Sequence, residues 1–192
     1  MTVAALVAIA APAIDAVVDA HAALRAKRPL VQALTNTVSS NFVANVLLSA
    51  GASPAMVDNP EEAALFAGIA DGVLINLGTP TAAQVEAMRL AAAAAQKAGK
   101  PWVLDPIAAG GLPWRGQVAA ELLKFKPAAV RGNASEIIGL AGLGGGRAVW
   151  TAPRAPRPLS RPQLICWRTR EPSQPPDLLT MWWGVSMAAR FW

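Results

Sequence analysis

Short apolar segments alternate with longer segments of helical periodicity along the first 140 residues of the chain. The short segments have the length and composition of buried strands, and they are residues 30–35, 53–57, 72–78, 102–106 and 128–132. The stretches between them, at 36–49, 60–70, 81–98 and 116–125, have the apolar spacing of helices. Strands that alternate with helices and are apolar almost throughout predict a parallel sheet with helices on both faces. The pattern therefore predicts an α/β fold.

Polar residues mark the starts of several expected helices. Asn59 suits an N-cap and Pro60 the first helical position that follows it. Thr81 and Gln84 have the spacing of a capping box, in which each side chain accepts a hydrogen bond from the other residue's backbone. These signals fix where two of the helices begin.

The first 28 residues are also apolar, and the pattern favours an amphipathic helix over a signal peptide. They lack a basic start, Pro12 interrupts the apolar run, and Asp15 and Asp19 follow it. No apolar run in the sequence reaches the ~18 residues that a membrane-spanning helix needs. We therefore expect a soluble cytoplasmic protein with no membrane partner.

The composition changes abruptly after Gly146. Residues 1–146 hold ten Lys/Arg and ten Asp/Glu, so the net charge of +5 comes from residues 147–192, with seven Arg and two acidic residues. These last 46 residues also hold seven of the 16 prolines and five of the seven tryptophans, without a helix or strand period. We interpret residues 1–146 as the N-terminal part of one domain. We interpret residues 147–192 as a disordered tail translated from a non-native reading frame.

The alternative for residues 147–192 is a native tail that binds RNA. Interleaved Arg and Trp suit single-stranded nucleic acid, but GC-rich codons read out of frame give the same mixture. Because residues 1–146 are electrically neutral, we expect no nucleic-acid partner for that part of the chain. Cys166 is the only cysteine, which excludes an intrachain disulfide, and we expect no catalytic role for it.

Candidate chemistry gathers where the expected strands end, because ligands of parallel sheets bind at the carboxyl edge. Asp105 ends one strand, and Gly110 and Gly111 in the following turn let the backbone approach a ligand. A carboxylate here suits Mg²⁺, which prefers one or two carboxylates together with phosphate oxygens. The alternative is an ordinary Asp-Pro strand exit without a ligand.

A cation and a second acid follow the last expected strand. Arg131 suits a nucleotide phosphate, and the helix start after Asn133 favours anions. Glu136 is a candidate second carboxylate near a metal ion, and its spacing from Asn133 also fits a capping box. The two roles of Glu136 are compatible.

Two further candidates follow the first and second strands. Asn36 is placed to orient a polar ligand, and Met56 to line a ligand pocket. The alternatives are helix capping for Asn36 and core packing for Met56. Asn41 and Asn45 are four residues apart and share a helix face, with hydrogen bonds between helices as the alternative to a ligand role.

The order of these motifs resembles the hydroxyethylthiazole kinase family of thiamine biosynthesis and salvage. The matching stretches span about residues 20–142, and they are PLVQALTNTVSSNFVANVLLSAGASPAM, NPEEAALFAGIADGVLINLGT, GKPWVLDPIAAGG and VRGNASEI. The resemblance implies a ribokinase-like fold, a mostly parallel sheet flanked by helices, here incomplete at the C-terminus. It also implies transfer of the γ-phosphoryl group of ATP to 4-methyl-5-(2-hydroxyethyl)thiazole with Mg²⁺.

The resemblance assigns roles to residues that match the family's motifs. Met56 and Asn36 correspond to positions near the thiazole, and Arg131 to a position that contacts ATP. Asp105 and Glu136 correspond to positions near Mg²⁺ and phosphate. The family typically forms a homotrimer with the thiazole site at the subunit interface, which implies the same assembly here.

The sequence also departs from the family pattern. The family often has Val-Gly-Ala after Asp-Pro, where this chain has Ile107-Ala108-Ala109, and Gln32 stands where a His is common. The family continues with a Thr-Gly-Glu segment that helps bind ATP and a Gly-Thr/Ala-Gly-Cys turn whose N–H groups stabilise the transferring phosphoryl. Neither occurs in residues 143–192.

We therefore assign no catalytic residue and expect the activity of this chain to be impaired. If the reading frame changes near residue 146, another frame of the gene encodes the two missing segments. The alternatives to a thiazole kinase are a non-catalytic thiazole-binding remnant and the related hydroxymethylpyrimidine kinase.

Overall fold

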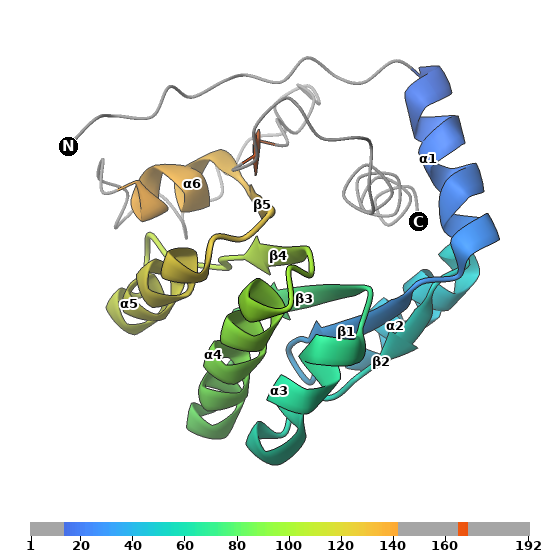
Figure 1. Cartoon of the computed structure of the whole chain (residues 1–192). Helices are drawn as coiled ribbons and strands as arrows, with labels where there is room; N and C mark the ends of the chain where they lie inside the picture. The colour runs from blue at the N-terminus through green and yellow to red at the C-terminus, as the bar shows by residue number, and fades with distance from the viewer. Residues whose placement is uncertain (1–13, 142–164, 169–192) are drawn as a thin grey trace.

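The computed structural model describes residues 14–141 and 165–168, which form a sheet flanked by helices (Figure 1). The strands are β1 (Leu30–Leu34), β2 (Ser53–Ala55), β3 (Gly72–Asn76), β4 (Trp102–Asp105), β5 (Ala129–Gly132) and β6 (Ile165–Arg168). The helices are α1 (Ile14–Lys27), α2 (Ser40–Ala50), α3 (Pro60–Ile69), α4 (Ala82–Lys97), α5 (Pro113–Leu122) and α6 (Ala134–Leu140), with a 3₁₀ helix at Leu123–Phe125. The predicted alternation of strands and helices is confirmed.

The first five strands form a parallel sheet in the order β2-β1-β3-β4-β5. Every residue of β3 and β4 is buried, as expected for central strands covered on both faces. The α/β fold is thus confirmed, with the carboxyl ends of β1, β3, β4 and β5 meeting at one edge of the sheet.

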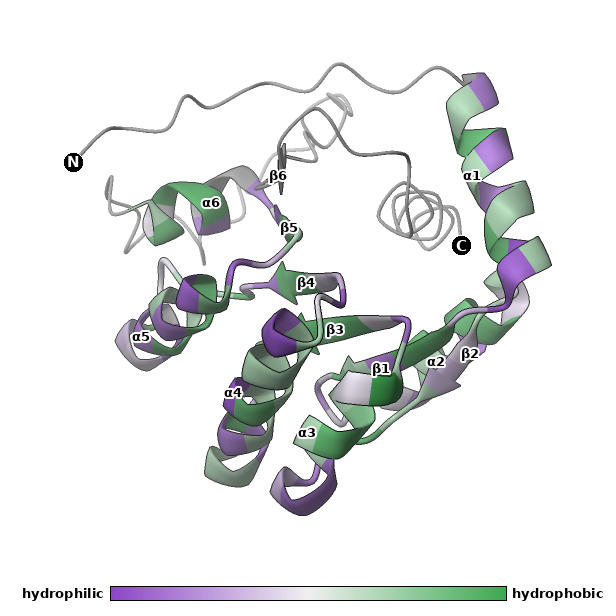
Figure 2. Ribbon diagram, in the orientation of Figure 1, coloured by the Kyte–Doolittle hydropathy of each residue, from purple (hydrophilic) through white to green (hydrophobic). Residues whose placement is uncertain are grey.

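Helices cover both faces of this sheet. On one face, Val73 and Leu104 pack with Met88 of α4, in a core to which α3, α5 and α6 also contribute. On the other face, Leu24 of α1 packs with Val31 of β1 and with α2. Figure 2 shows the hydrophobic strands lying between these helices. No helix in the described part of the chain is long and apolar enough to cross a membrane.

The predicted helix starts of α3 and α4 are confirmed. Asn59 caps α3 through its Oδ1, which accepts a hydrogen bond from the backbone N–H of Glu61 at 3.0 Å, and Pro60 lies in the first turn. Thr81 and Gln84 form the reciprocal capping box at the start of α4. Local side-chain chemistry therefore sets both helix starts.

Two helices begin elsewhere than the apolar spacing predicts. α2 begins at Ser40 instead of residue 36, because Asn36 closes a turn: its Oδ1 accepts from the backbone N–H of Ser39 at 2.9 Å. α5 begins at Pro113 instead of residue 116, since proline is well suited to the first helical turn.

Gln32 is a wholly buried polar side chain of β1. Its Nε2 donates to the backbone carbonyls of Val57 at 2.9 Å and Ala63 at 3.2 Å, while its Oε1 has no partner. Gln32 therefore ties β1 to the segment after β2 and to α3.

The structure describes only Ile165–Arg168 of the compositionally distinct region 147–192. These residues form β6, which pairs antiparallel with β5 and covers its edge, with Ile165 opposite Gly132. The side-chain pattern predicts no strand here, but edge pairing uses backbone groups alone. The other residues of 147–192, and residues 1–13, lie outside the described residues, so the disordered out-of-frame tail stays a prediction.

Candidate active site

Four neighbouring strands each carry a polar residue at or directly after their carboxyl end, and the four side chains lie on the same face of the sheet. The register pairs Asn76 with Asp105. One step beyond the paired residues, it sets Thr35 beside Asn76 and Arg131 beside Asp105. We call Thr35, Asn76, Asp105 and Arg131 the polar row. Because side chains alternate along a strand, all four belong to the face that also carries α1 and α2.

An apolar floor lies two positions before the polar row on the same strands. It consists of Ala33, Leu74, Val103 and Ala129, which are paired with one another across the sheet. Met56 packs against this floor from the segment after β2, half-buried and together with Val43 of α2. The structure therefore brings Met56 to the same face of the sheet as the polar row.

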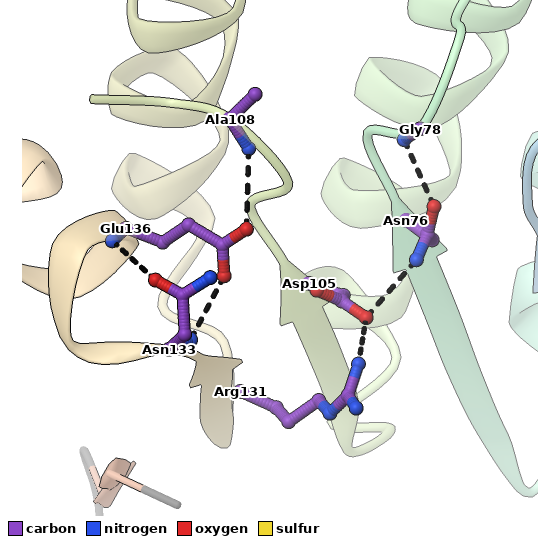
Figure 3. A network of polar contacts seen from close by, with 7 residues as sticks. All are labelled: Asn76, Gly78, Asp105, Ala108, Arg131, Asn133 and Glu136. Atoms are coloured by element: carbon purple, nitrogen blue, oxygen red, sulfur yellow. Dashed lines mark hydrogen bonds and ion pairs between the residues drawn. The ribbon is translucent and has the colours of Figure 1, made fainter. Parts of the chain in front are cut away.

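Asp105 is the buried carboxylate of the row, with 5% of its surface exposed. Its Oδ2 accepts hydrogen bonds from Arg131 Nη1 at 2.6 Å and from Asn76 Nδ2 at 3.0 Å (Figure 3). Burial raises the pKa of Asp105 above its ordinary value of 3.8, and the charge of Arg131 offsets this only in part. A second cation at this point would therefore favour the ionised carboxylate.

Arg131 retains capacity for a ligand beyond its ion pair with Asp105. Its side chain is 37% exposed, so the guanidinium reaches the surface. Its Nε is buried without a hydrogen-bond partner. A partly exposed guanidinium with an unused donor suits an anion such as phosphate.

Glu136 approaches the same edge from the first turn of α6. Its Oε2 accepts from the backbone N–H of Asn133 at 2.8 Å, and the Asn133 Oδ1 accepts from the N–H of Glu136 at 3.0 Å. This confirms the predicted capping box. Glu136 Oε1 lies 3.4 Å from the backbone nitrogen of Ala108, after β4 (Figure 3). The charge of Glu136 also raises the pKa of Asp105, so both carboxylates act in one electrostatic environment.

Gly78 connects Asn36 to the polar row. A Cβ atom at Gly78 would lie 2.6 Å from Asn36 Nδ2 and 2.8 Å from Asn76 Oδ1, so both side chains pack directly against the glycine. Asn36 is thereby held at the boundary between β1 and β3. Asn41 and Asn45 instead hydrogen-bond to each other at 2.6 Å on an exposed face of α2, as their spacing predicts, and they do not reach the row.

Two carboxylates are what this edge offers a metal ion. Within the described residues, no group of three or more His, Cys, Asp or Glu side chains gathers to hold one. This sparse donor set does not match a tetrahedral zinc site. It fits Mg²⁺, which uses one or two carboxylates and completes its shell with water and phosphate oxygens.

The strand-end rule points to Thr35 together with Asn36 but gives Thr35 no role, and it misses Asn76. The expected third strand runs to residue 78, which places Asn76 inside a buried strand instead of at its end. Thr35 is buried and its Oγ1 has no hydrogen-bond partner. The available signal was the alternation of side chains along a strand. Each of these residues lies two positions after an apolar residue of the floor and therefore shares its face of the sheet.

Known proteins resemble this chain over the region that contains the candidate site. The model of the hydroxyethylthiazole kinase family matches residues 21–152. The chain belongs to the hydroxyethylthiazole kinase family. It is 60% identical over 132 residues to "Hydroxyethylthiazole kinase" of Rhodococcus erythropolis, covering 69% of this chain and 47% of that protein. It is 53% identical over 152 residues to the protein of the same name in Corynebacterium glutamicum, covering 79% and 57%.

A solved hydroxyethylthiazole kinase also shares the fold. The protein from Pyrococcus horikoshii superposes with a TM-score of 0.65 and 38% identity, over 68% of this chain and 51% of its own. The chain thus spans about half the length of the family members it matches. The stretch that the family model matches, residues 21–152, includes every residue of the polar row.

Ala108 occupies a position where the backbone conformation favours glycine. Its φ is +60°, in the left-handed region, and its side chain is 5% exposed. This conformation costs a non-glycine residue about 1–2 kcal/mol. The loop whose Ala108 N–H faces Glu136 is therefore strained.

We expect A108G to change the free energy of unfolding by less than about 0.8 kcal/mol in either direction. Relief of about 1–2 kcal/mol of strain offsets about 0.8 kcal/mol of lost methyl burial and about 0.5–1 kcal/mol of glycine entropy. Ala109 is also buried but has no positive φ, so A109G should destabilise by about 1–2 kcal/mol. Urea unfolding compares the two variants, and equal losses would contradict strain at Ala108.

We expect D105N to gain stability relative to the wild type as the pH rises. In the wild type, the folded-state pKa of Asp105 lies above the unfolded value near 3.8, so stability falls as the pH rises from that value through the folded pKa. The amide that replaces the carboxyl group in D105N does not titrate, and it keeps an oxygen for Arg131. The urea midpoints of D105N and the wild type, compared from acidic to neutral pH, measure this relative stability. If the advantage of D105N became smaller as the pH rises, the raised pKa of Asp105 would be contradicted.

Proposed function

We propose that the chain is a hydroxyethylthiazole kinase, which transfers the γ-phosphoryl group of ATP to the hydroxyl of 4-methyl-5-(2-hydroxyethyl)thiazole. In this reaction a bond forms between the alcohol oxygen and the γ-phosphorus, the bond to the ADP oxygen breaks, and the alcohol loses its proton. The polar row above an apolar floor carries the proposal, because it offers charged groups for phosphate beside an apolar surface for a ring.

Arg131 and the two carboxylates supply the phosphate side of the proposed site. Arg131 contacts the phosphates of ATP through the guanidinium atoms that Asp105 leaves unused. Asp105 and Glu136 are the residues that would hold Mg²⁺. When bound, Mg²⁺ neutralises phosphate charge and orients the γ-phosphoryl group. Burial of Asp105 makes it dependent on nearby cations, which supports this assignment.

Met56 and Asn36 supply the thiazole side of the proposed site. Met56 presents its thioether on the apolar floor, where a polarisable side chain suits a sulfur-containing aromatic ring. Asn36 is anchored through its Oδ1 on Ser39, while its Nδ2 lies next to Gly78. Asn36 is therefore a polar group that lies directly after β1, beside the β1 end of the apolar floor.

We propose that turnover by this chain is low. The family's Gly-Thr/Ala-Gly-Cys turn does not occur in residues 143–192, and removing donors that stabilise a transition state costs about 10²–10³ in rate. Thiazole binding is the property that Met56, Asn36 and the apolar floor support most directly. A cytoplasmic location is part of the same proposal, since ATP is the co-substrate.

Calorimetry and [γ-³²P]ATP turnover test the assignment. We expect the chain to bind the thiazole alcohol and to turn it over at least about 10²-fold more slowly than a full-length family member. M56A should weaken thiazole binding about tenfold, since it removes most of the apolar side chain that the thiazole would cover. D105N should abolish the remaining turnover and leave thiazole binding intact. L65A, on the exposed surface of α3, is the control and should change neither.

The same measurements separate the alternatives. Tighter binding of hydroxymethylpyrimidine than of the thiazole would identify the related kinase instead. Thiazole binding without detectable turnover would identify a non-catalytic remnant. Absence of thiazole binding would overturn the assignment of Met56 and Asn36.

We also propose a homotrimer with the thiazole site at the subunit interface. The support is a group of exposed apolar residues on α2 and in the turn before it. Val38, which precedes the helix, is 88% exposed, and Phe42 and Leu48 of α2 are each 57% exposed. Large apolar residues that gather on an outer face mark a surface for a partner. α2 follows Asn36 closely in the chain, so a neighbour seated on this face would lie close to the thiazole side of the site.

We expect F42E to convert the trimer into monomers and weaken thiazole binding, because a charge there would be buried without a partner. Sedimentation velocity measures the oligomeric state. L65E places the same charge on the apolar surface of α3 and should leave the trimer intact. A trimer that survives F42E would show that α2 is not the interface.

A further inference from the structure

Asn76 has a side-chain orientation that its neighbours determine completely. The backbone N–H of Gly78 can only donate, and it lies 2.8 Å from Asn76 Oδ1. The amide nitrogen must therefore face the other way, toward Asp105 Oδ2 at 3.0 Å (Figure 3). Asn76 is buried, so water does not compete for either contact.

The contacts of Asp105 are divided unequally between its two oxygens. Both Asn76 Nδ2 and Arg131 Nη1 donate to Oδ2. None of the hydrogen bonds of Asp105 in the described structure goes to Oδ1. One oxygen is thus anchored, and the other is left for a ligand.

We propose that Asn76 is a positioning residue that anchors Asp105 Oδ2 and thereby presents Oδ1 to the metal–nucleotide ligand. The inference rests on the proposed function for the identity of that ligand, but the anchoring itself is a property of the two side chains. Residues behind a metal ligand orient it, and their loss typically costs 10–100-fold in affinity. Arg131 cannot replace Asn76, because it approaches from the opposite neighbouring strand, β5, and is itself assigned to ATP.

The chain contains a matched control for this arrangement. Gln84 also accepts a backbone N–H through its side-chain oxygen, from Thr81 at 3.0 Å, and donates through its nitrogen to a carboxylate, Asp58, at 2.9 Å. Q84A therefore removes the same pair of contacts as N76A, but away from the polar row. An effect specific to N76A therefore reports on the contacts of Asn76 with Asp105 and Gly78.

The first readout is the side-chain rotamer of Asp105, from χ1 couplings in the isotope-labelled chain without ligand. We expect one rotamer in the wild type and in Q84A, and averaging between rotamers in N76A. A single unchanged rotamer in N76A would overturn the proposal. This readout needs neither metal nor catalysis, so it stands apart from the fate of the proposed function.

The second readout is the affinity for Mn²⁺ in the presence of ATP, followed by electron paramagnetic resonance. We expect N76A to weaken binding about tenfold in the wild-type background. It should cause no further loss in the D105N background, because a residue that acts only through Asp105 has nothing left to position. Q84A should change neither value.

The two readouts separate failure of this proposal from failure of the proposed function. If N76A costs the same in both backgrounds, Asn76 acts through the Gly78 turn and the proposal is wrong. If D105N binds Mn²⁺ and ATP as well as the wild type does, the metal role of Asp105 fails. In that case the rotamer readout alone decides whether Asn76 positions Asp105.

Discussion

The burial of one carboxylate beside one guanidinium is the constraint around which the candidate site is arranged. Asp105 ends a central strand, so its charge leaves water together with the apolar residues that precede it. Such a group is stable in its ionised form only where charges and donors converge on it. Arg131 and Asn76 reach it because the parallel register sets β5 and β3 on either side of β4.

The same geometry connects the two carboxylates to the loop after β4. Glu136 belongs to α6, and α6 lies so close to this loop that a Cβ on Gly139 would fall 2.2 Å from the Cα of Gly110. This approach of two backbones carries Glu136 to the N–H of Ala108. A capping residue of a short helix therefore becomes part of the site, and the strained backbone at Ala108 stands at the contact point.

The described part of the chain brings the polar row together at one edge of the sheet. The strands that carry the polar row, β1, β3, β4 and β5, each have a neighbouring strand on both sides. The opposite face of these strands packs against α3, α4 and α5 in the hydrophobic core. The edge beyond β5 is covered by the four residues of β6 through backbone pairing. Phosphoryl transfer depends on positioning and charge stabilisation. In the proposed function, Arg131, Asp105 and Glu136 are the charged groups that would position the nucleotide and its metal ion.

The sequence by itself determined the elements, their order and most of the candidate residues. Apolar runs of strand length and capping signals such as Asn59-Pro60 and Thr81…Gln84 depend on neighbours within a few residues, so they can be read from the chain. Asp105 and Arg131 were recognisable because ligands of parallel sheets bind at the carboxyl ends of the strands, and Glu136 was recognisable from its spacing to Asn133.

Only the tertiary structure decided which of these residues meet and through which atoms. The partners Asn76, Asp105 and Arg131 come from three strands separated by helices, and their contact depends on strand order and on a register set by packing. Asn76 was not recognised from the chain, because the expected strand runs to residue 78 and places this residue inside an apolar strand. Its role emerges only when the pleat turns it toward Asp105 and the turn at Gly78 fixes its amide.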